Sequence, residues 1–306
     1  MTQDEPDSAS ASGAGAAADE SGQRPPRYLF TVDGQHPRSV LPLVCDLAAD
    51  AGAELFIGAP VTVPEQTPLE AQEPQFRGDR LAAKHALAAK TTCGEGVEEV
   101  NSLVRIGHHR DAIIADMVGS VGITTLIEEV VPESGIRSLF EGDFEERAVS
   151  DTCDTITVSR LGALAASDDI DSILAPIAAG PHSGMAIDVA VALARQNDAT
   201  VELMHVEDVA AAPDDRVGEQ VLASGIQRAR DSVGVSRTLL EGDSVAETII
   251  TYAADFDLTV MGAPREGLLK QFVRGTVPSA VSEGADSTVL TTYRAGVDTS
   301  WLDRWL

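Results

Sequence analysis

The residues best suited to chemistry in this chain follow an apolar run, Leu258–Met261, that predicts a buried strand. Gly262 ends the run, and Gly275 with Thr276 opens a new helical pattern further along. Glycines let a backbone bend sharply and approach a ligand closely, and the free N–H groups at the start of a helix attract anions. Arg265 adds a guanidinium, whose shape suits phosphate oxygens. The segment predicts a phosphate cradle at the end of a strand, and an ordinary strand–helix connection is the alternative.

A regular alternation of strand and helix patterns surrounds this loop in the second half of the chain. The predicted strands cover residues 173–177, 201–206, 236–240, 258–261 and 287–292, and the predicted helices cover 185–195, 219–233, 245–254 and 277–283. Alternation of this kind implies a parallel sheet that is covered by helices on both faces.

The first half of the chain repeats the pattern. Its predicted strands cover residues 28–32, 54–57, 100–106, 124–131 and 155–158, and its predicted helices cover 39–51, 80–89 and 110–117. The sequences Ala148–Asp151 and Ala280–Glu283 both precede a Thr-rich apolar strand. A repeat of this length indicates tandem domains rather than a solenoid. We predict an α/β protein with an acidic disordered tail (1–26), a first domain (27–160), a linker (161–171), a second domain (172–293) and a C-terminal tail (294–306).

The charge of the chain restricts its partners. Its 306 residues include 49 acidic and 22 basic ones, which gives a formal net charge of −27. Such a charge argues against nucleic acid, because phosphate backbones bind lysine and arginine, and against anionic membrane surfaces. Only Lys84, Lys90 and Lys270 are lysines. Many acids with few lysines suggest a halophilic protein that stays soluble in concentrated salt, and an ordinary acidic protein is the alternative.

Neither a membrane segment nor a disulfide is expected. No apolar run approaches the ~20 residues that span a bilayer, and no basic-then-apolar leader is present, so we expect a cytoplasmic protein without membrane insertion. Cys45, Cys93 and Cys153 are odd in number and widely spaced. This spacing predicts neither a disulfide framework nor a metal site. Cys45 lies in an apolar helical pattern and is expected in the core.

The second half of the chain resembles the universal stress protein family. After their fourth strand, members of that family carry a glycine, two residues, a glycine, nine residues, and then Gly-Ser or Gly-Thr. Gly262, Gly275 and Thr276 match this spacing, whereas Arg265 stands in place of the second glycine. The strand order and the strand end at His205-Val206 also fit. The first half resembles the family more weakly, mainly through the internal repeat.

The resemblance implies a flavodoxin- or Rossmann-like fold of the adenine nucleotide alpha hydrolase-like type, in the tandem-domain form. In nucleotide-binding members, ATP lies where the strand order of the sheet reverses. Carried over to this chain, Val206 supplies a main-chain contact, and Gly262, Gly275 and Thr276 surround the phosphates together with Arg265. The segment Ala175–Ser183 resembles the haloarchaeal type of this family, which is related to domains fused to amino-acid transporters.

An aspartate at the end of the first strand helps to hold the nucleoside in the family, and the two halves differ at this position. The second half ends its first strand with Ile177-Ala178-Ala179 and lacks the aspartate. The first half keeps it as Asp33, but Asp143 stands where Thr276 stands in the second half. A carboxylate at a helix N-terminus occupies the N–H groups that a phosphate would use. We therefore predict that the first half has lost phosphate binding, which makes Asp33 a secondary candidate.

Catalysis is not the favoured interpretation. The chain shows no nucleophile–base set, no Walker loop and no dinucleotide fingerprint. His205 and the pair His108-His109 are interpreted as structural. The leading hypothesis is a non-catalytic stress-response or regulatory module that binds ATP or a related nucleotide in its second domain. The alternative is a ligand-free interaction protein that regulates a partner such as an amino-acid transporter, and slow ATP hydrolysis stays open as a third reading.

The last strand of each half suggests how the domains assemble. Residues 155–158 and 288–292 would each leave an open sheet edge if they were unpaired. Pairing them within one chain would give an intramolecular pseudo-dimer. The segment Trp301–Leu306 holds both tryptophans and offers a surface for a homodimer as an alternative.

Overall fold

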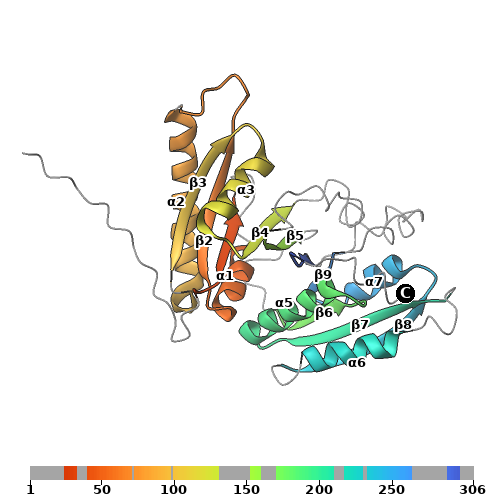
Figure 1. The fold of residues 1–306 in the computed structure, drawn as a ribbon. Helices are drawn as coiled ribbons and strands as arrows, with labels where there is room; N and C mark the ends of the chain where they lie inside the picture. The colour runs from red at the N-terminus through yellow and green to blue at the C-terminus, as the bar shows by residue number, and fades with distance from the viewer. Residues whose placement is uncertain are drawn as a thin grey trace, which may run out of the picture.

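The computed structural model describes residues 24–32, 40–70, 72–97, 99–130, 152–159, 170–209, 217–229, 233–263 and 288–296. Within these residues, ten strands form one mostly parallel sheet that carries helices on its faces (Figure 1). The α/β fold class predicted from the alternation of strands and helices is therefore confirmed.

Each half of the chain contributes five strands to this sheet. The elements of the first half are β1 (Arg27–Thr31), α1 (Leu41–Asp50), β2 (Glu54–Thr62), α2 (Gln72–Cys93), the short 3₁₀ turn η2 (Gly94–Gly96), β3 (Val100–Gly107), α3 (Arg110–Val121), β4 (Thr125–Val130) and β5 (Asp154–Ser159). Those of the second half are β6 (Ser172–Pro176), α5 (Pro181–Asn197), β7 (Thr200–Asp208), α6 (Gly218–Arg228), β8 (Val235–Gly242), α7 (Val245–Ala253), β9 (Leu258–Gly262) and β10 (Thr288–Tyr293). The predicted helix at 277–283, the linker and both tails lie outside the described residues, except for a few flanking positions.

The strand order across the sheet is β3-β2-β1-β4-β5-β10-β9-β6-β7-β8. From either outer edge inward, the two halves follow the same order. Neighbouring strands pair in parallel within each half, whereas β5 and β10 pair antiparallel, with Leu290 opposite Val158. This pair, which we call the seam, joins the two halves into one continuous sheet.

Both faces of the central strands are buried, because helices cover both faces of the sheet and successive side chains of a strand point to opposite faces. In β1, Phe30 packs in the core that α1, α2, α5 and α6 share, and Leu29 faces the separate core beneath α3. In the second half, Leu174 and Met204 pack beneath α7. The shared core contains residues from both halves, so the seam lies under a continuous apolar layer.

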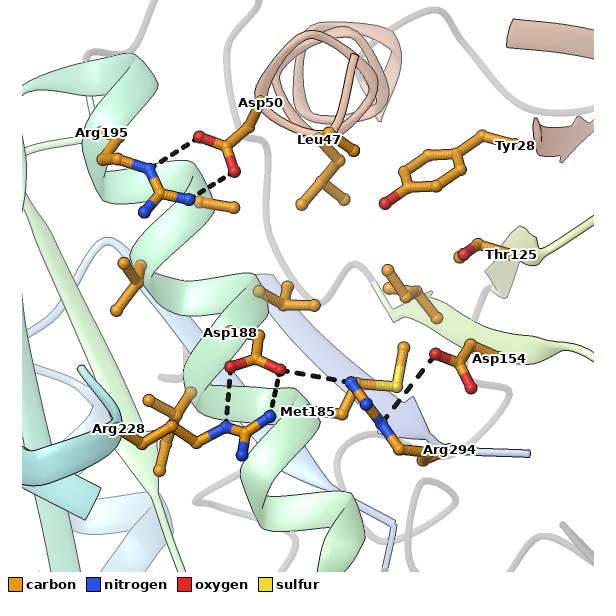
Figure 2. Close-up of a pocket in the computed structure, with 16 residues that line it drawn as sticks. Tyr28, Leu47, Asp50, Thr125, Asp154, Met185, Asp188, Arg195, Arg228 and Arg294 are labelled. Atoms are coloured by element: carbon orange, nitrogen blue, oxygen red, sulfur yellow. Dashed lines mark hydrogen bonds and ion pairs between the residues drawn. The ribbon is translucent and has the colours of Figure 1, made fainter. Parts of the chain in front are cut away.

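Two helices from different halves, α1 and α5, contact each other across the seam. Arg195 of α5 donates hydrogen bonds from Nε and Nη2 to Asp50 of α1, at 2.7 and 2.5 Å (Figure 2). Asn197 donates from Nδ2 to Asp46 Oδ2 at 3.0 Å. Burial raises the pKa of Asp46, and the Asn197 hydrogen bond opposes this shift.

Local signals explain where the helices begin and end. Gly122 ends α3 with a φ of 66°, in the left-handed region that glycine favours. Ser244 accepts a hydrogen bond from the Glu247 N–H at 3.4 Å and caps α7. The helix α5 begins at Pro181, earlier than predicted, since proline is well suited to a first helical position.

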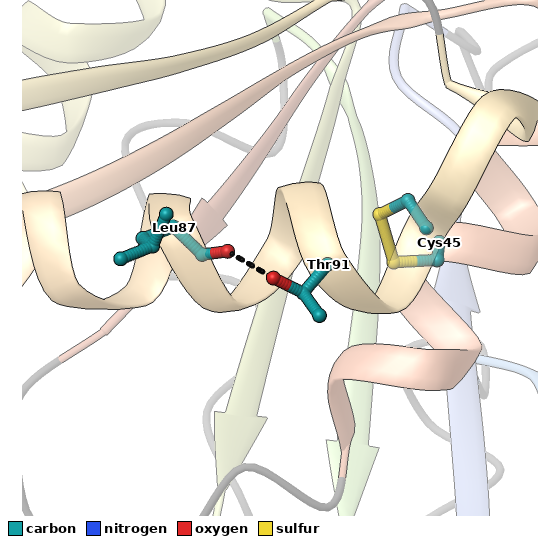
Figure 3. The surroundings of a disulfide bond; sticks show 4 residues. Cys45, Leu87 and Thr91 are labelled. Carbon is teal, nitrogen blue, oxygen red and sulfur yellow. Dashed lines mark hydrogen bonds between the residues drawn. A yellow bond between two sulfur atoms is a disulfide. The ribbon is translucent and has the colours of Figure 1, made fainter.

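The expectation that the cysteines form no disulfide is wrong. Cys45 of α1 and Cys93 of α2 form a disulfide (Figure 3). Cys45 is also buried in the shared core, as predicted. The bond links positions with a sequence separation of 48, and such a distance along the chain carries no signal about proximity in space. Packing of α1 beside α2 over the same face of the sheet brings the two side chains together.

Cys153, the remaining cysteine, is free and buried. Burial raises the pKa of its thiol to about 11, helped by the nearby carboxylates of Asp154 and Glu128 and opposed by a hydrogen bond to the Leu126 backbone. The thiolate is the reactive form of cysteine, so this side chain is a core residue rather than a nucleophile.

None of the helices in the described ranges is both long and apolar enough to span a membrane.

Candidate functional site

The strand order of the second half reverses beside β6, which lies between β7 and β9. All three strands run parallel, so their carboxyl ends meet at one edge of the sheet. In open α/β sheets, ligands bind at this kind of position. It is the place where the sequence analysis expected a nucleotide.

Two of the predicted site residues lie in the described part of the chain. Val206 is buried in β7 and packs in the core beneath α7. Gly262 is the last residue of β9. Arg265, Gly275, Thr276 and the secondary candidate Asp33 lie outside the described residues. Their roles therefore stay predictions from the sequence.

Gly262 lies against the first turn of α5. A Cβ at this position would lie 2.7 Å from the carbonyl carbon of His182 and 2.7 Å from the backbone nitrogen of Ser183. Real Cβ atoms do not approach backbone atoms so closely, so the absence of a side chain here is required by chain packing. The sequence pattern suggested that a ligand approaches this glycine closely, and the structure adds a steric role.

We expect Gly262→Ala to lower the free energy of unfolding by about 1–3 kcal/mol, the usual effect of an overpacked site. Gly119→Ala serves as the control, because Gly119 lies in α3 and a Cβ there would point into open space. Alanine should be neutral or slightly stabilising there. Urea denaturation followed by circular dichroism measures both variants. Equal midpoints for Gly262→Ala and the unmodified protein would contradict the steric argument.

His182 connects the first turn of α5 to the ends of β9 and β10 through side-chain and backbone contacts. Its ring stacks on Tyr293 with 4.5 Å between centroids, and its Nδ1 accepts a hydrogen bond from the Arg294 N–H at 3.1 Å. Its carbonyl oxygen accepts a hydrogen bond from Thr292 Oγ1 at 3.1 Å. Sequence reasoning missed this role, since nothing in the local pattern pairs residues so far apart along the chain.

His205, interpreted above as structural, contacts the backbone where two strands end. Its Nδ1 lies 2.7 Å from the carbonyl oxygen of Ile177, which makes it the donor in a bond between the ends of β7 and β6. Beside it, Glu207 Oε1 accepts a hydrogen bond from the Gly218 N–H at 2.8 Å. A carboxylate of the chain itself therefore occupies the N-terminus of α6.

The equivalent strand ends in the first half hold an ion pair. Arg110, at the start of α3, donates from Nη2 to Glu128 Oε1 of β4 at 3.1 Å. Glu128 is buried, and Thr31 of β1 lies opposite it in register. Thr31 Oγ1 is 3.5 Å from both Glu128 Oε1 and Arg110 Nη2. A buried carboxylate at this position disfavours a second anion.

Among the described residues, no group of three or more His, Cys, Asp or Glu side chains could hold a metal ion. One member of the His108-His109 pair contacts the backbone, because His108 Nδ1 lies 3.2 Å from the carbonyl oxygen of Val63.

Residues 170–292 match the model of the "Universal stress protein family". No curated protein matches the chain in sequence.

Solved structures resemble this chain to different degrees. A universal stress protein from Archaeoglobus fulgidus DSM 4304 has a TM-score of 0.55 at 12% identity, over 88% of this chain and 96% of that chain. A functionally unknown protein from Pseudomonas aeruginosa PAO1 has a TM-score of 0.50 at 15% identity, over 87% of this chain and 91% of that chain. A universal stress protein in complex with cAMP has a TM-score of 0.33 at 17% identity, over 42% of this chain and all of that chain. At such identities, the first two support the fold alone. Residues 170–292 thus resemble the universal stress protein family in sequence, within a fold similar to that of solved universal stress proteins.

Proposed function

We propose that this chain is a non-catalytic stress-response or regulatory module whose second half binds ATP or a related nucleotide. The observation that carries the proposal is the family match over residues 170–292, which includes Gly262 and the Gly275-Thr276 pair. The reversal of strand order beside β6 supports it, because such positions bind ligands. The Arg110–Glu128 ion pair supports the loss of anion binding in the first half.

Replacing Thr276 with aspartate should mimic Asp143 of the first half and weaken ATP binding at least about tenfold, because the carboxylate would occupy the helix N-terminus and repel phosphate. Isothermal titration of ATP into both proteins in molar salt measures the effect. Thr276→Ser is the matched control, since it keeps the hydroxyl and should keep the affinity. Equal affinity of the aspartate variant and the unmodified protein would place the site elsewhere.

A ligand-free interaction protein is the second candidate, and an exposed surface on α2 favours it. Phe76 and Leu87 are 65% and 68% exposed. Their separation of about three helical turns places them on one side of the helix. Arg80 and Lys84 lie between them in the sequence and are also exposed. An apolar and basic surface on a chain of charge −27 suits an acidic partner. The suggestion that this partner is an amino-acid transporter rests on the sequence resemblance alone. If the unmodified protein shows no ATP binding in the titration, this candidate is preferred.

We also propose that the protein works in concentrated salt in the cytoplasm. Repulsion among the acidic side chains should loosen the fold when salt no longer screens it. The melting temperature should therefore fall markedly between molar and ~0.1 M KCl. Sucrose of matched osmolality at ~0.1 M KCl is the control, since it should not restore the melting temperature fully. A flat or inverted dependence on salt would contradict the halophilic proposal.

A further inference from the structure

A cavity of about 300 Å³ lies where the two halves of the molecule meet, between α1 and α5 (Figure 2). This volume is at the lower end of the range for small-molecule pockets. The first half lines the cavity with residues of β1, β4, β5 and α1, and the second half with residues of α5, α6 and the segment after β10. Neither Val206 nor Gly262 lines it, so it is separate from the described part of the proposed nucleotide site.

The charged side chains around the cavity balance one another. Three aspartates and three arginines are among its lining residues, namely Asp50, Asp154, Asp188, Arg195, Arg228 and Arg294. Arg195 forms the bidentate ion pair with Asp50 described above. Arg228 donates from Nε and Nη2 to Asp188 at 2.7 and 2.6 Å. A lining without excess positive charge is poorly suited to a polyphosphate.

Arg294 and Asp154 are less completely paired than the other charged residues. Arg294 Nη2 donates to Asp188 Oδ2 at 3.2 Å. Its Nε lies 3.9 Å from Asp154 Oδ2, too far for a hydrogen bond, and is buried with no hydrogen-bond partner among the described residues. Asp154 Oδ1 accepts from the Ala295 N–H at 2.9 Å. A buried unsatisfied donor costs about 1–3 kcal/mol, so a ligand oxygen at Nε would be stabilised.

The rest of the cavity combines one polar group with an apolar wall. The Tyr28 phenol points toward the cavity (Figure 2). Burial raises its pKa, as do the nearby Asp154 and Asp50, against a hydrogen bond with Thr125 that lowers it. The phenol therefore keeps its proton at neutral pH and can donate. Leu47, Ile156 and Met185 supply buried apolar surface.

We propose that this cavity binds a small zwitterion with an apolar body, of the size and chemistry of a free aliphatic amino acid. Its carboxylate accepts a hydrogen bond from Arg294 Nε, and its ammonium group donates to Asp154. Its apolar body lies on Leu47 and Met185. Because the walls come from both halves, an occupied cavity stabilises their association and raises the melting temperature.

L-leucine is the probe that tests this proposal, by isothermal titration and by the melting temperature of the full chain. Two analogues separate the charges: 4-methylpentanoate lacks the ammonium group, and 3-methylbutylamine lacks the carboxylate. We expect leucine to bind and to raise the melting temperature, and each analogue to bind at least about tenfold more weakly. No leucine binding up to roughly 10 mM would overturn the proposal, and so would equal binding of 4-methylpentanoate, which would indicate a simple anion site.

Three variants locate the binding. Arg294→Gln should weaken leucine binding at least about tenfold, because it removes the charge-assisted donor. Arg237→Gln is the control, since Arg237 pairs with Glu219 away from the cavity and its loss should leave the affinity unchanged. If Arg294→Gln does not fold, Asp154→Asn replaces it, because it removes the negative charge that the ammonium group contacts. Unchanged leucine affinity in the cavity variant tested would overturn the proposal. ATP titration of the same variant distinguishes this site from the nucleotide site, whose affinity should not change.

Discussion

Cys93→Ala is expected to lower the free energy of unfolding by about 2–4 kcal/mol relative to the oxidised protein. The Cys45–Cys93 bond closes a segment with a sequence separation of 48. In the chain-entropy description, closing a loop of this length raises the free energy of the unfolded chain by about 4 kcal/mol. Disulfides typically contribute about 2–4 kcal/mol to stability. The bond also holds α1 beside α2 in the core that α1 shares with α5.

Guanidinium denaturation with and without dithiothreitol measures this effect. The reductant should lower the midpoint of the unmodified protein to near that of Cys93→Ala. Cys93→Ala serves as the control, because the reductant should not change the denaturation midpoint of this variant. A midpoint of the unmodified protein that is unaffected by the reductant would show that the bond does not form or does not stabilise.

The same bond bears on the compartment of the protein. Disulfides are rare in the cytosol, where thiols are kept reduced, and those found there are usually catalytic or redox-sensing, apart from disulfide-rich intracellular proteins of hyperthermophiles. Alkylation of thiols at the moment of lysis would therefore show whether the proposed cytoplasmic protein carries Cys45 and Cys93 oxidised in cells.

Leu290→Ala is expected to lower the free energy of unfolding by about 2–5 kcal/mol, the usual range for deleting a buried leucine side chain. Leu290 is 0% exposed at the seam and faces the equally buried Val158 in register. Its loss leaves a cavity in the core that both halves share. Leu87→Ala is the matched control, because Leu87 is 68% exposed on α2, and its effect should stay within about 0.5 kcal/mol.

Thermal unfolding followed by circular dichroism compares these two leucine variants. Leu290→Ala should have a melting temperature well below that of the unmodified protein. Leu87→Ala should have the same melting temperature as the unmodified protein. If both variants melt together, the burial of Leu290 at the seam contributes little to the stability of the chain.

Local periodicity in the sequence was enough to predict the α/β class. The apolar run at 258–261 became β9, and the predicted strand at 28–32 became β1, with Leu29 and Phe30 in cores on opposite faces of the sheet. Such patterns depend on neighbours along the chain, because side chains alternate every two residues in a strand and every 3.6 in a helix. The spacing of Gly262, Gly275 and Thr276 likewise pointed to the family whose model matches residues 170–292.

Tertiary structure alone decided the contacts between distant residues. Packing of α1 beside α2 made Cys45 and Cys93 partners, and packing of α5 on β9 explains why Gly262 has no room for a side chain. The cavity that contains Arg294 and Asp154 exists only because β5 and β10 join the two halves. The sequence carries no periodic signal for such pairs, since their proximity depends on the free energy of packing whole helices and strands together rather than on the spacing of residues along the chain.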